Sequence, residues 1–120
     1  MPSVAVIGAS NAHQKYGNKA VRAYLRQGWT VYPVNPTEQA VEGLKVYATV
    51  ADLPGPVDRV SMYVPPAVGI TLLDAIKAKA PAAELFLNPG SESDALVERA
   101  TALGMDPIQA CSIVDIGERP

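Results

Sequence analysis

Short runs rich in β-branched residues alternate along this chain with longer stretches of helical period. This alternation is typical of βαβ units, whose parallel strands form a sheet covered by helices on both faces. At 120 residues, the chain has the size of one compact domain. We therefore expect a single domain over residues 1–120, with an α/β, Rossmann-like fold of three layers and a five-stranded, mainly parallel sheet. The strands are predicted at residues 3–7, 30–34, 59–64, 83–87 and 106–109.

Three of the intervening stretches have the spacing of amphipathic helices. Between the first two strands, Val21, Tyr24 and Leu25 form one apolar face, and Gly28 is expected to end the helix. Residues 36–56 are less regular, and only a short helix or turn is expected there. The apolar faces of the other two helices are predicted to contain Val68, Leu72, Ala75 and Ile76 after the third strand, and Leu96, Val97, Ala100 and Leu103 after the fourth.

The charge balance and the residue content argue against several kinds of partner. A net charge of −2 and an isoelectric point near 5.3 provide no basic field for a nucleic-acid backbone. No apolar run reaches membrane-spanning length, and the apolar residues 4–7 lack the preceding basic segment of a signal peptide. A lone cysteine, Cys111, and a lone histidine, His13, argue against an internal disulfide and a structural zinc site. We therefore expect a cytoplasmic protein that binds neither nucleic acid nor membrane.

The loop after the first strand has the composition of a phosphate site. Gly8 lets the backbone approach a phosphate closely, and Ser10 and Asn18 can donate hydrogen bonds. The loop then leads into a helix amino terminus, whose unpaired amides and dipole favour an anion. The pattern departs from the G-x-G-x-x-G fingerprint, because Ala9 follows the first glycine and the next glycine is Gly17. A glycine-rich surface turn without a ligand is the alternative.

Two side chains of the same loop carry charge or can acquire it. Lys15 either contacts a phosphate or is simply solvated, and the sequence does not distinguish these roles. His13 is expected to be a solvated loop residue, because no acid or nucleophile accompanies it in sequence. No Ser-His-Asp order, paired carboxylates or metal cluster occurs elsewhere, so we expect no catalytic residues and no metal site.

The end of the second strand bears on which nucleotide is bound. An NAD-dependent dehydrogenase normally places an acidic residue there to hold the ribose hydroxyls. This chain has Asn35 followed by Pro36, with no adjacent arginine, which argues against both NAD and NADP. An asparagine amide in this turn can bind a ribose or a base without charge. The alternative is a plain turn, which is the commoner use of Asn-Pro.

The third and fourth strands also end in loops with rigid or small residues. Val64 and Pro65 could form an apolar shelf for an adenine ring. Asn88 and Gly90 follow the fourth strand, beside a further proline. Because the carboxyl ends of parallel strands meet at one edge of the sheet, these loops are expected to complete the same site. Proline at a helix start is the ordinary alternative for Pro65.

Several motifs occur in order along the chain: residues 6–10, 28–36, Gly43, residues 57–60, Val64-Pro65, Gly90, Gly104-Met105 and Cys111. Together they resemble the small CoA-binding domain family, whose fold also forms the amino-terminal domain of the succinyl-CoA synthetase α subunit. The resemblance implies that residues 8–18 hold the pyrophosphate of coenzyme A, and that the Asn35 and Val64 loops flank the adenosine. In the synthetase the phosphorylated histidine belongs to a second domain, so His13 does not inherit that role.

Three hypotheses about function follow from these residues. The leading hypothesis is a binding protein that holds coenzyme A or an acyl-CoA through its ADP and pyrophosphate portion, without catalysis of its own. Such a protein could present the ligand to an unknown protein partner. The alternative is an enzyme, either an NAD(P)-binding oxidoreductase or a synthetase-like subunit. A third hypothesis is a structural partner protein that binds no nucleotide.

Overall fold

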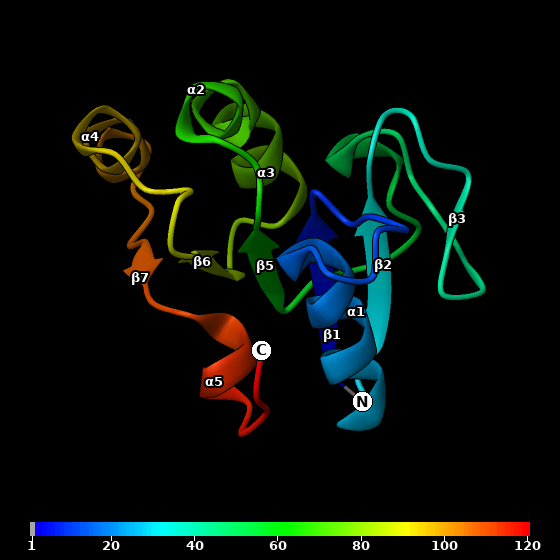
Figure 1. Cartoon of the computed structure of the whole chain (residues 1–120). Helices are drawn as coiled ribbons and strands as arrows, with labels where there is room; N and C mark the ends of the chain where they lie inside the picture. Colours follow the sequence, from blue (N-terminus) through cyan, green and yellow to red (C-terminus); the bar gives the residue numbers. More distant parts are fainter. Residues whose placement is uncertain (1) are drawn as a thin grey trace.

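A five-stranded parallel sheet forms the centre of the protein in a computed structural model that describes residues 2–120. The strand order is β2-β1-β5-β6-β7, and each neighbouring pair is parallel (Figure 1). The prediction of five strands is confirmed, and the sheet is entirely rather than mainly parallel. The third strand ends two residues earlier than predicted, and the last begins two residues later. The strands are β1 (Ser3–Ile7), β2 (Thr30–Val34), β5 (Arg59–Met62), β6 (Glu84–Leu87) and β7 (Ile108–Gln109).

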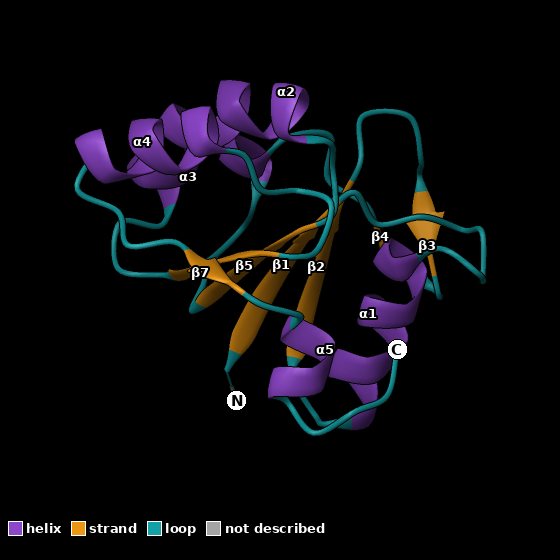
Figure 2. Cartoon of the chain, turned by 60° about the vertical axis from the view of Figure 1, so that its left-hand side comes forward, coloured by secondary structure: helices purple, strands orange, loops and turns teal. Residues whose placement is uncertain are grey.

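Helices cover both faces of this sheet, which confirms the three-layer arrangement (Figure 2). On one face lie α1 (Tyr16–Arg26) and α5 (Ser112–Asp115). The other face carries α2 (Pro66–Gly69), a 3₁₀ turn (Ile70–Leu72), α3 (Leu73–Lys79) and α4 (Asp94–Ala102).

Within residues 2–120, no helix has both the length and the apolar character needed to cross a bilayer.

The central strand β1 is buried on both sides. Ala5 and Ile7 belong to the core on the side of α3 and α4, whereas Val4 and Val6 belong to the core beneath α1. Successive side chains of a strand point to opposite faces, so a strand covered on both faces is apolar throughout. This explains why the sequence reads as a continuous apolar run up to Gly8.

Two of the three predicted helix faces need correction. In α1, Val21 and Tyr24 are buried as predicted, but Leu25 is 38% exposed. After β5, Val68 is 47% exposed and Ala75 is also exposed. The 3₁₀ turn between α2 and α3 has three residues per turn, which shifts the buried stripe relative to a continuous α-helix. The residues that this stripe buries are Gly69, Leu73 and Ile76. For α4, the burial of Leu96 and Ala100 agrees with the prediction.

A small hairpin in the irregular stretch was not predicted. Its strands are β3 (Ala40–Val41) and β4 (Leu44–Lys45), which pair antiparallel. The turn residues Glu42 and Gly43 have φ angles of 49° and 77°. Positive φ at both positions is the signature of a type I′ turn, which usually contains Asn-Gly or Asp-Gly. Glu-Gly is a weak form of this signal.

The chain after this hairpin covers the outer edge of β2. Tyr47 forms a parallel bridge with Val34. Its amide donates to the Pro33 oxygen at 2.9 Å, and its own oxygen accepts from the Asn35 amide at 3.0 Å. Because an exposed strand edge invites pairing with other chains, this contact protects the sheet.

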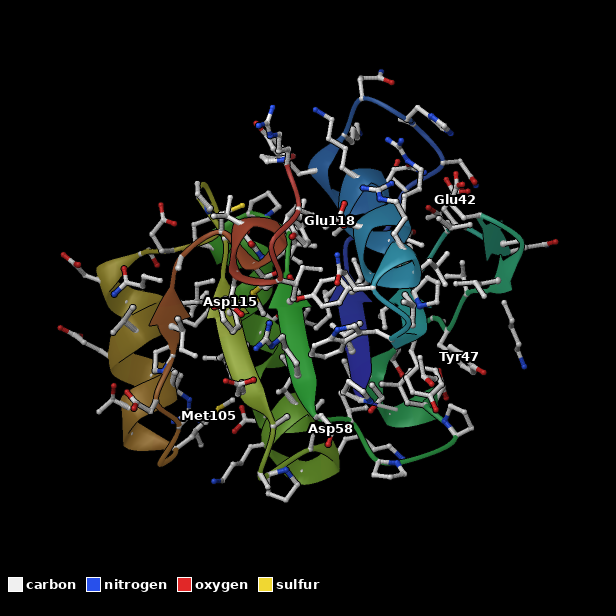
Figure 3. The ribbon with its side chains drawn as sticks, turned by 90° about the horizontal axis from the view of Figure 1, so that it is seen from below. Glu42, Tyr47, Asp58, Met105, Asp115 and Glu118 are labelled. Atoms are coloured by element: carbon white, nitrogen blue, oxygen red, sulfur yellow. The ribbon has the colours of Figure 1, made fainter. Side chains whose placement is uncertain are left out.

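The short helix α5, which was not predicted, is tied to the sheet by a buried arginine. Arg59 of β5 lies between the rings of Trp29 and Phe86, at 5.1 and 4.4 Å from their centres. Its guanidinium forms 2.9 Å ion pairs with Glu84 of β6 and Asp115 of α5. Figure 3 shows Asp115 on the C-terminal segment, over the sheet strands. This arginine therefore fixes α5 against the same face as α1.

Candidate functional site

The strand order places a crevice at the carboxyl ends of β1 and β5. The chain runs outward from β1 to β2 and then crosses back to β5 on the other side of β1. Ligands of open parallel sheets bind where the order reverses in this way. A pocket of about 710 Å³ opens there, with walls from the loops that follow β1, β2, β5 and β6. Eight of the twelve predicted binding residues line it: Gly8, Ser10, Lys15, Gly17, Asn35, Val64, Pro65 and Gly90.

The other four predicted residues lie outside the lining of this pocket. Ala9, Asn18 and Asn88 are buried in the protein, and Pro36 is exposed beyond the wall. Asn88 lines a smaller pocket next to the first. The structure therefore brings the predicted loops together, but some of their residues support the wall from behind.

Gly8 is constrained by the protein itself as well as by any ligand. Its φ angle is +92°, a conformation that residues with a side chain rarely adopt. A Cβ atom at this position would lie 3.1 Å from Val64 Cγ1 and 3.2 Å from the carbonyl carbon of Tyr63. The glycine thus allows the end of β1 to pack closely against the chain leaving β5.

Gly17 allows a second close approach, between the start of α1 and the end of β1. A Cβ atom at Gly17 would overlap the carbonyl oxygen of Gly8. In the dinucleotide fingerprint, the third glycine supplies this kind of helix-to-strand packing. The sequence lacks that fingerprint, yet Gly17 allows the same kind of close contact between helix and strand.

The amino terminus of α1 forms one wall of the pocket and has no side-chain cap. Its N-cap residue is Lys15, whose side chain makes no capping hydrogen bond, and the first turn has no acidic residue. Lys15, Tyr16 and Gly17 all line the pocket. The first amides of a helix have no partner within it, and the helix dipole makes this end positive. Together with the lysine, this end of α1 favours an anion.

Asn18 holds the loop in place from its buried position. Its Nδ2 donates to the Ser10 backbone oxygen at 2.9 Å and to Glu42 Oε2 at 3.1 Å. Its Oδ1 accepts from Arg22 Nε at 2.7 Å. Glu42 lies beside this loop in Figure 3. The amide was expected to contact a phosphate, but here it bonds to protein groups on both sides.

Asn35 joins the loops after β1 and β2. Its Nδ2 donates to the Ala9 oxygen at 2.8 Å. Its Oδ1 accepts from the Thr37 amide at 2.8 Å and from the Thr37 hydroxyl at 2.9 Å. An Asx turn of this kind is the ordinary role of asparagine before proline, and here it also shapes the pocket wall.

The sequence analysis missed a carboxylate in the pocket wall. Glu38 lies three residues after Asn35 and lines the pocket with Thr37. Asn11 Nδ2 donates to its Oε2 at 2.6 Å. The prediction rested on the residue directly after β2, whereas the turn at Asn35 brings the later carboxylate back to the same wall.

Tyr16, Tyr63 and Pro89 are further wall residues that the sequence analysis did not select. They separate the main pocket from the smaller one, of about 290 Å³, and line both. The Tyr63 hydroxyl lies 3.3 Å from Ser112 Oγ. Burial raises the pKa of Tyr63 to about 12, although its hydrogen bonds to Ser112 and Ser61 act in the opposite direction. This tyrosine is therefore a neutral wall residue at ordinary pH.

The titratable residues do not gather around the pocket as a metal-binding group. Among residues 2–120, no group of three or more His, Cys, Asp or Glu side chains could hold a metal ion. The His13 side chain is 68% exposed and pairs with Glu42 at 3.3 Å, away from the pocket lining.

Comparison with known proteins identifies related chains. The family model described as CoA binding domain matches residues 2–117. A solved structure of a conserved hypothetical protein from Pyrococcus furiosus is 32% identical, with a TM-score of 0.85. That match covers 96% of this chain and 99% of the other.

Larger synthetases contain a similar segment. The acetate–CoA ligase (ADP-forming) II subunit alpha of Pyrococcus furiosus is 46% identical over 63 residues, which are 52% of this chain but 14% of the relative. The structure of an acetyl-coenzyme A synthetase 1 from Ca. Korarchaeum cryptofilum, in complex with phosphate and ADP, is 30% identical with a TM-score of 0.75. That match covers 90% of this chain and 25% of the synthetase. The chain therefore spans only a fraction of these enzymes.

Proposed function

Because the chain belongs to the CoA binding domain family, we propose that it binds coenzyme A or an acyl-CoA through the ADP and pyrophosphate portion, without catalysis of its own. The observation that carries this proposal is the uncapped amino terminus of α1, which lines a large pocket at the reversal of strand order. An anion at that position would accept hydrogen bonds from the unpaired amides of this helix end.

The pyrophosphate is assigned to the wall formed by Gly8, Ser10 and the start of α1. The amides of Tyr16 and Gly17 open the helix, and glycine at position 17 lets this end of α1 lie against the Gly8 carbonyl group. The Ser10 hydroxyl accepts a hydrogen bond from the Ala12 amide at 3.0 Å, so its own hydrogen remains available for a phosphate oxygen. Lys15 supplies a positive charge at the same wall.

The adenosine is assigned to the space between the Asn35 loop and the Val64-Pro65 shelf. These residues line the pocket on opposite sides of Gly8, one after β2 and the other after β5. An apolar surface with a few polar groups is the usual composition of a site for a base. Pro89 and Gly90, after β6, line the far side of the pocket.

As a single domain of residues 1–120 that binds its ligand without converting it, the protein would store or sense CoA, or present CoA to a protein partner. The free Cys111 fits a reducing compartment such as the cytoplasm. A test for turnover follows from the same proposal: purified protein should neither hydrolyse acyl-CoA nor form it from an acid and a nucleotide. Steady conversion that follows the protein through chromatography would contradict the proposal.

A second candidate, NAD binding, is favoured by one observation. Glu38 lines the pocket on the β2 side, and a carboxylate on that side holds the ribose hydroxyls in dehydrogenases. The hydrogen bond from Asn11 already engages one of its oxygens. The two candidates differ in the charge near the ribose, since CoA carries a 3′-phosphate that a carboxylate would repel.

Ligand-induced stabilisation distinguishes these candidates. A ligand at 100 times its dissociation constant stabilises a protein by about 2.7 kcal/mol, which is readily measured by thermal unfolding. We expect CoA to raise the Tm more than NAD, NADP or ATP at equal concentration. Stabilisation by NADH without stabilisation by CoA would select the second candidate. Mass spectrometry of gently purified protein would identify any retained ligand directly.

A further inference from the structure

A second pocket, of about 290 Å³, opens directly beside the proposed pyrophosphate site. It shares Tyr16, Tyr63 and Pro89 with the larger pocket. The two pockets therefore adjoin at these three residues. The rest of the smaller pocket is formed by Asn88, Cys111, Val114 and Pro120.

The lining of this second pocket is apolar and carries no charged side chain. Its one amide, Asn88, is engaged elsewhere: Nδ2 donates to Ser61 Oγ at 3.0 Å and to the Met62 oxygen at 2.8 Å, and Oδ1 accepts from the Ser112 amide at 2.9 Å. The pocket is therefore suited to an uncharged, apolar group rather than to a second phosphate.

Exposed apolar side chains flank the same pocket. Of the four large apolar residues that are exposed within residues 2–120, two line it: Tyr16 is 55% exposed and Val114 is 58% exposed. Tyr16 opens α1 and Val114 lies in α5, so the two come from opposite ends of the chain. Both side chains add apolar surface to this pocket.

We propose that this second pocket holds the acyl end of an acyl-CoA, and that the preferred ligand carries a short, uncharged acyl chain. The inference rests on the proposed function, in which the pyrophosphate lies at the start of α1. Tyr16 belongs to both walls, so an arm that folds back past this residue would bring the acyl group from the pyrophosphate side to the apolar pocket. Lys19 Nζ lies 4.9 Å from the centre of the Tyr16 ring, but the lining itself offers no charged side chain to an acyl group ending in a carboxylate.

Titration calorimetry with CoA, acetyl-CoA, butyryl-CoA and succinyl-CoA tests the inference. Butyryl and succinyl groups have the same number of carbons and differ in their charged end. Burial of a methylene contributes about 0.8 kcal/mol, so each added methylene should tighten binding about fourfold until the pocket is full. Succinyl-CoA should bind at least about tenfold more weakly than butyryl-CoA. Equal affinities for CoA, acetyl-CoA and butyryl-CoA would overturn the inference and leave the proposed function intact.

A matched pair of variants locates the effect. Val114→Asp places a carboxylate at the second pocket, whereas Val68→Asp changes a valine of similar exposure on α2. Val114→Asp should abolish the preference for butyryl-CoA over CoA while keeping the affinity for ADP, which has no arm. Val68→Asp should keep both. A butyryl preference that survives Val114→Asp would overturn the inference, and absence of binding by CoA and ADP alike would reject the proposed function itself.

Discussion

The Asn35 side chain donates a 2.8 Å hydrogen bond to the backbone oxygen of Ala9, and so joins the loop after β2 to the loop after β1. Both loops contribute to the wall of the larger pocket. The position of this wall therefore depends on an amide hydrogen that a carboxylate does not have.

Replacing Asn35 by Asp is expected to separate these two loops. The carboxylate would place an acceptor against the Ala9 oxygen, at a cost of about 1–3 kcal/mol of unfolding free energy. CoA affinity should fall about tenfold, as measured by calorimetry beside a urea melt. Thr37→Val is the control, because it removes a hydroxyl that donates to Asn35 but keeps the bond to Ala9. Equal losses in both variants would show that the Ala9 bond is not the important one.

Gly17→Ala is expected to destabilise the protein, because the new Cβ would overlap the Gly8 oxygen. Overpacking of this kind typically costs about 1–3 kcal/mol. The control is Gly55→Ala, where a Cβ would make only an ordinary contact, 3.5 Å from the Tyr32 hydroxyl. Urea unfolding should show a large loss for the first variant and little or none for the second. If both variants are equally stable, α1 does not rest on β1 as described.

Ser10→Ala tests the assigned pyrophosphate contact. A hydrogen bond to a charged oxygen contributes about 1.5–3 kcal/mol, so binding of CoA should weaken by about tenfold or more. Ser93→Ala is the matched control. Ser93 caps α4 by accepting from the Leu96 amide at 3.1 Å, and it does not line the pocket. Its loss should lower stability by about 1 kcal/mol and leave CoA affinity unchanged. Unchanged affinity in folded Ser10→Ala would place the phosphate elsewhere.

The stability contributed by Tyr63 should be lost in alkali. Burial raises its pKa from 10.0 to about 12, so the folded protein holds this proton more tightly than the unfolded chain. The contribution is complete below pH 10 and is lost as the pH rises through 12. By pH 11 the wild type should lose about 1 kcal/mol relative to Tyr63→Phe, which cannot ionise. Thermal melts at pH 8 and pH 11 measure this difference.

The strands were predictable because short β-branched runs bounded by glycine and proline favour strands over helices. The hairpin at 40–45 was missed, since Glu42-Gly43 is a weak turn signal. The helix α5 was also missed, because four residues show no helical period. Its position depends on the ion pair between Arg59 and Asp115, which are 56 residues apart in sequence. No local pattern contains that information.

The main pocket was predictable to the level of loops, because parallel strands end at one edge of a sheet. Which side chains face the ligand was less predictable. The Asn18 amide forms hydrogen bonds with protein groups behind the pocket wall, and the turn at Asn35 brings Glu38 back to this wall. The second pocket could not be inferred from sequence, since it needs Cys111 and Val114 to fold back beside Tyr16.

The position of β1 in the middle of the sheet also determines at what stage of chain synthesis a ligand can bind. β1 emerges first, yet one of its neighbours begins at Arg59 and the outer pocket wall includes Ser91. Until those later segments pair, the Gly8 loop lacks the Tyr63–Val64 side of its pocket. A nascent chain thus has no complete ligand pocket, because contacts between segments that are far apart in sequence form late. A ligand bound in this pocket would therefore stabilise only the completed sheet, and its occupancy would report that the chain has reached that state.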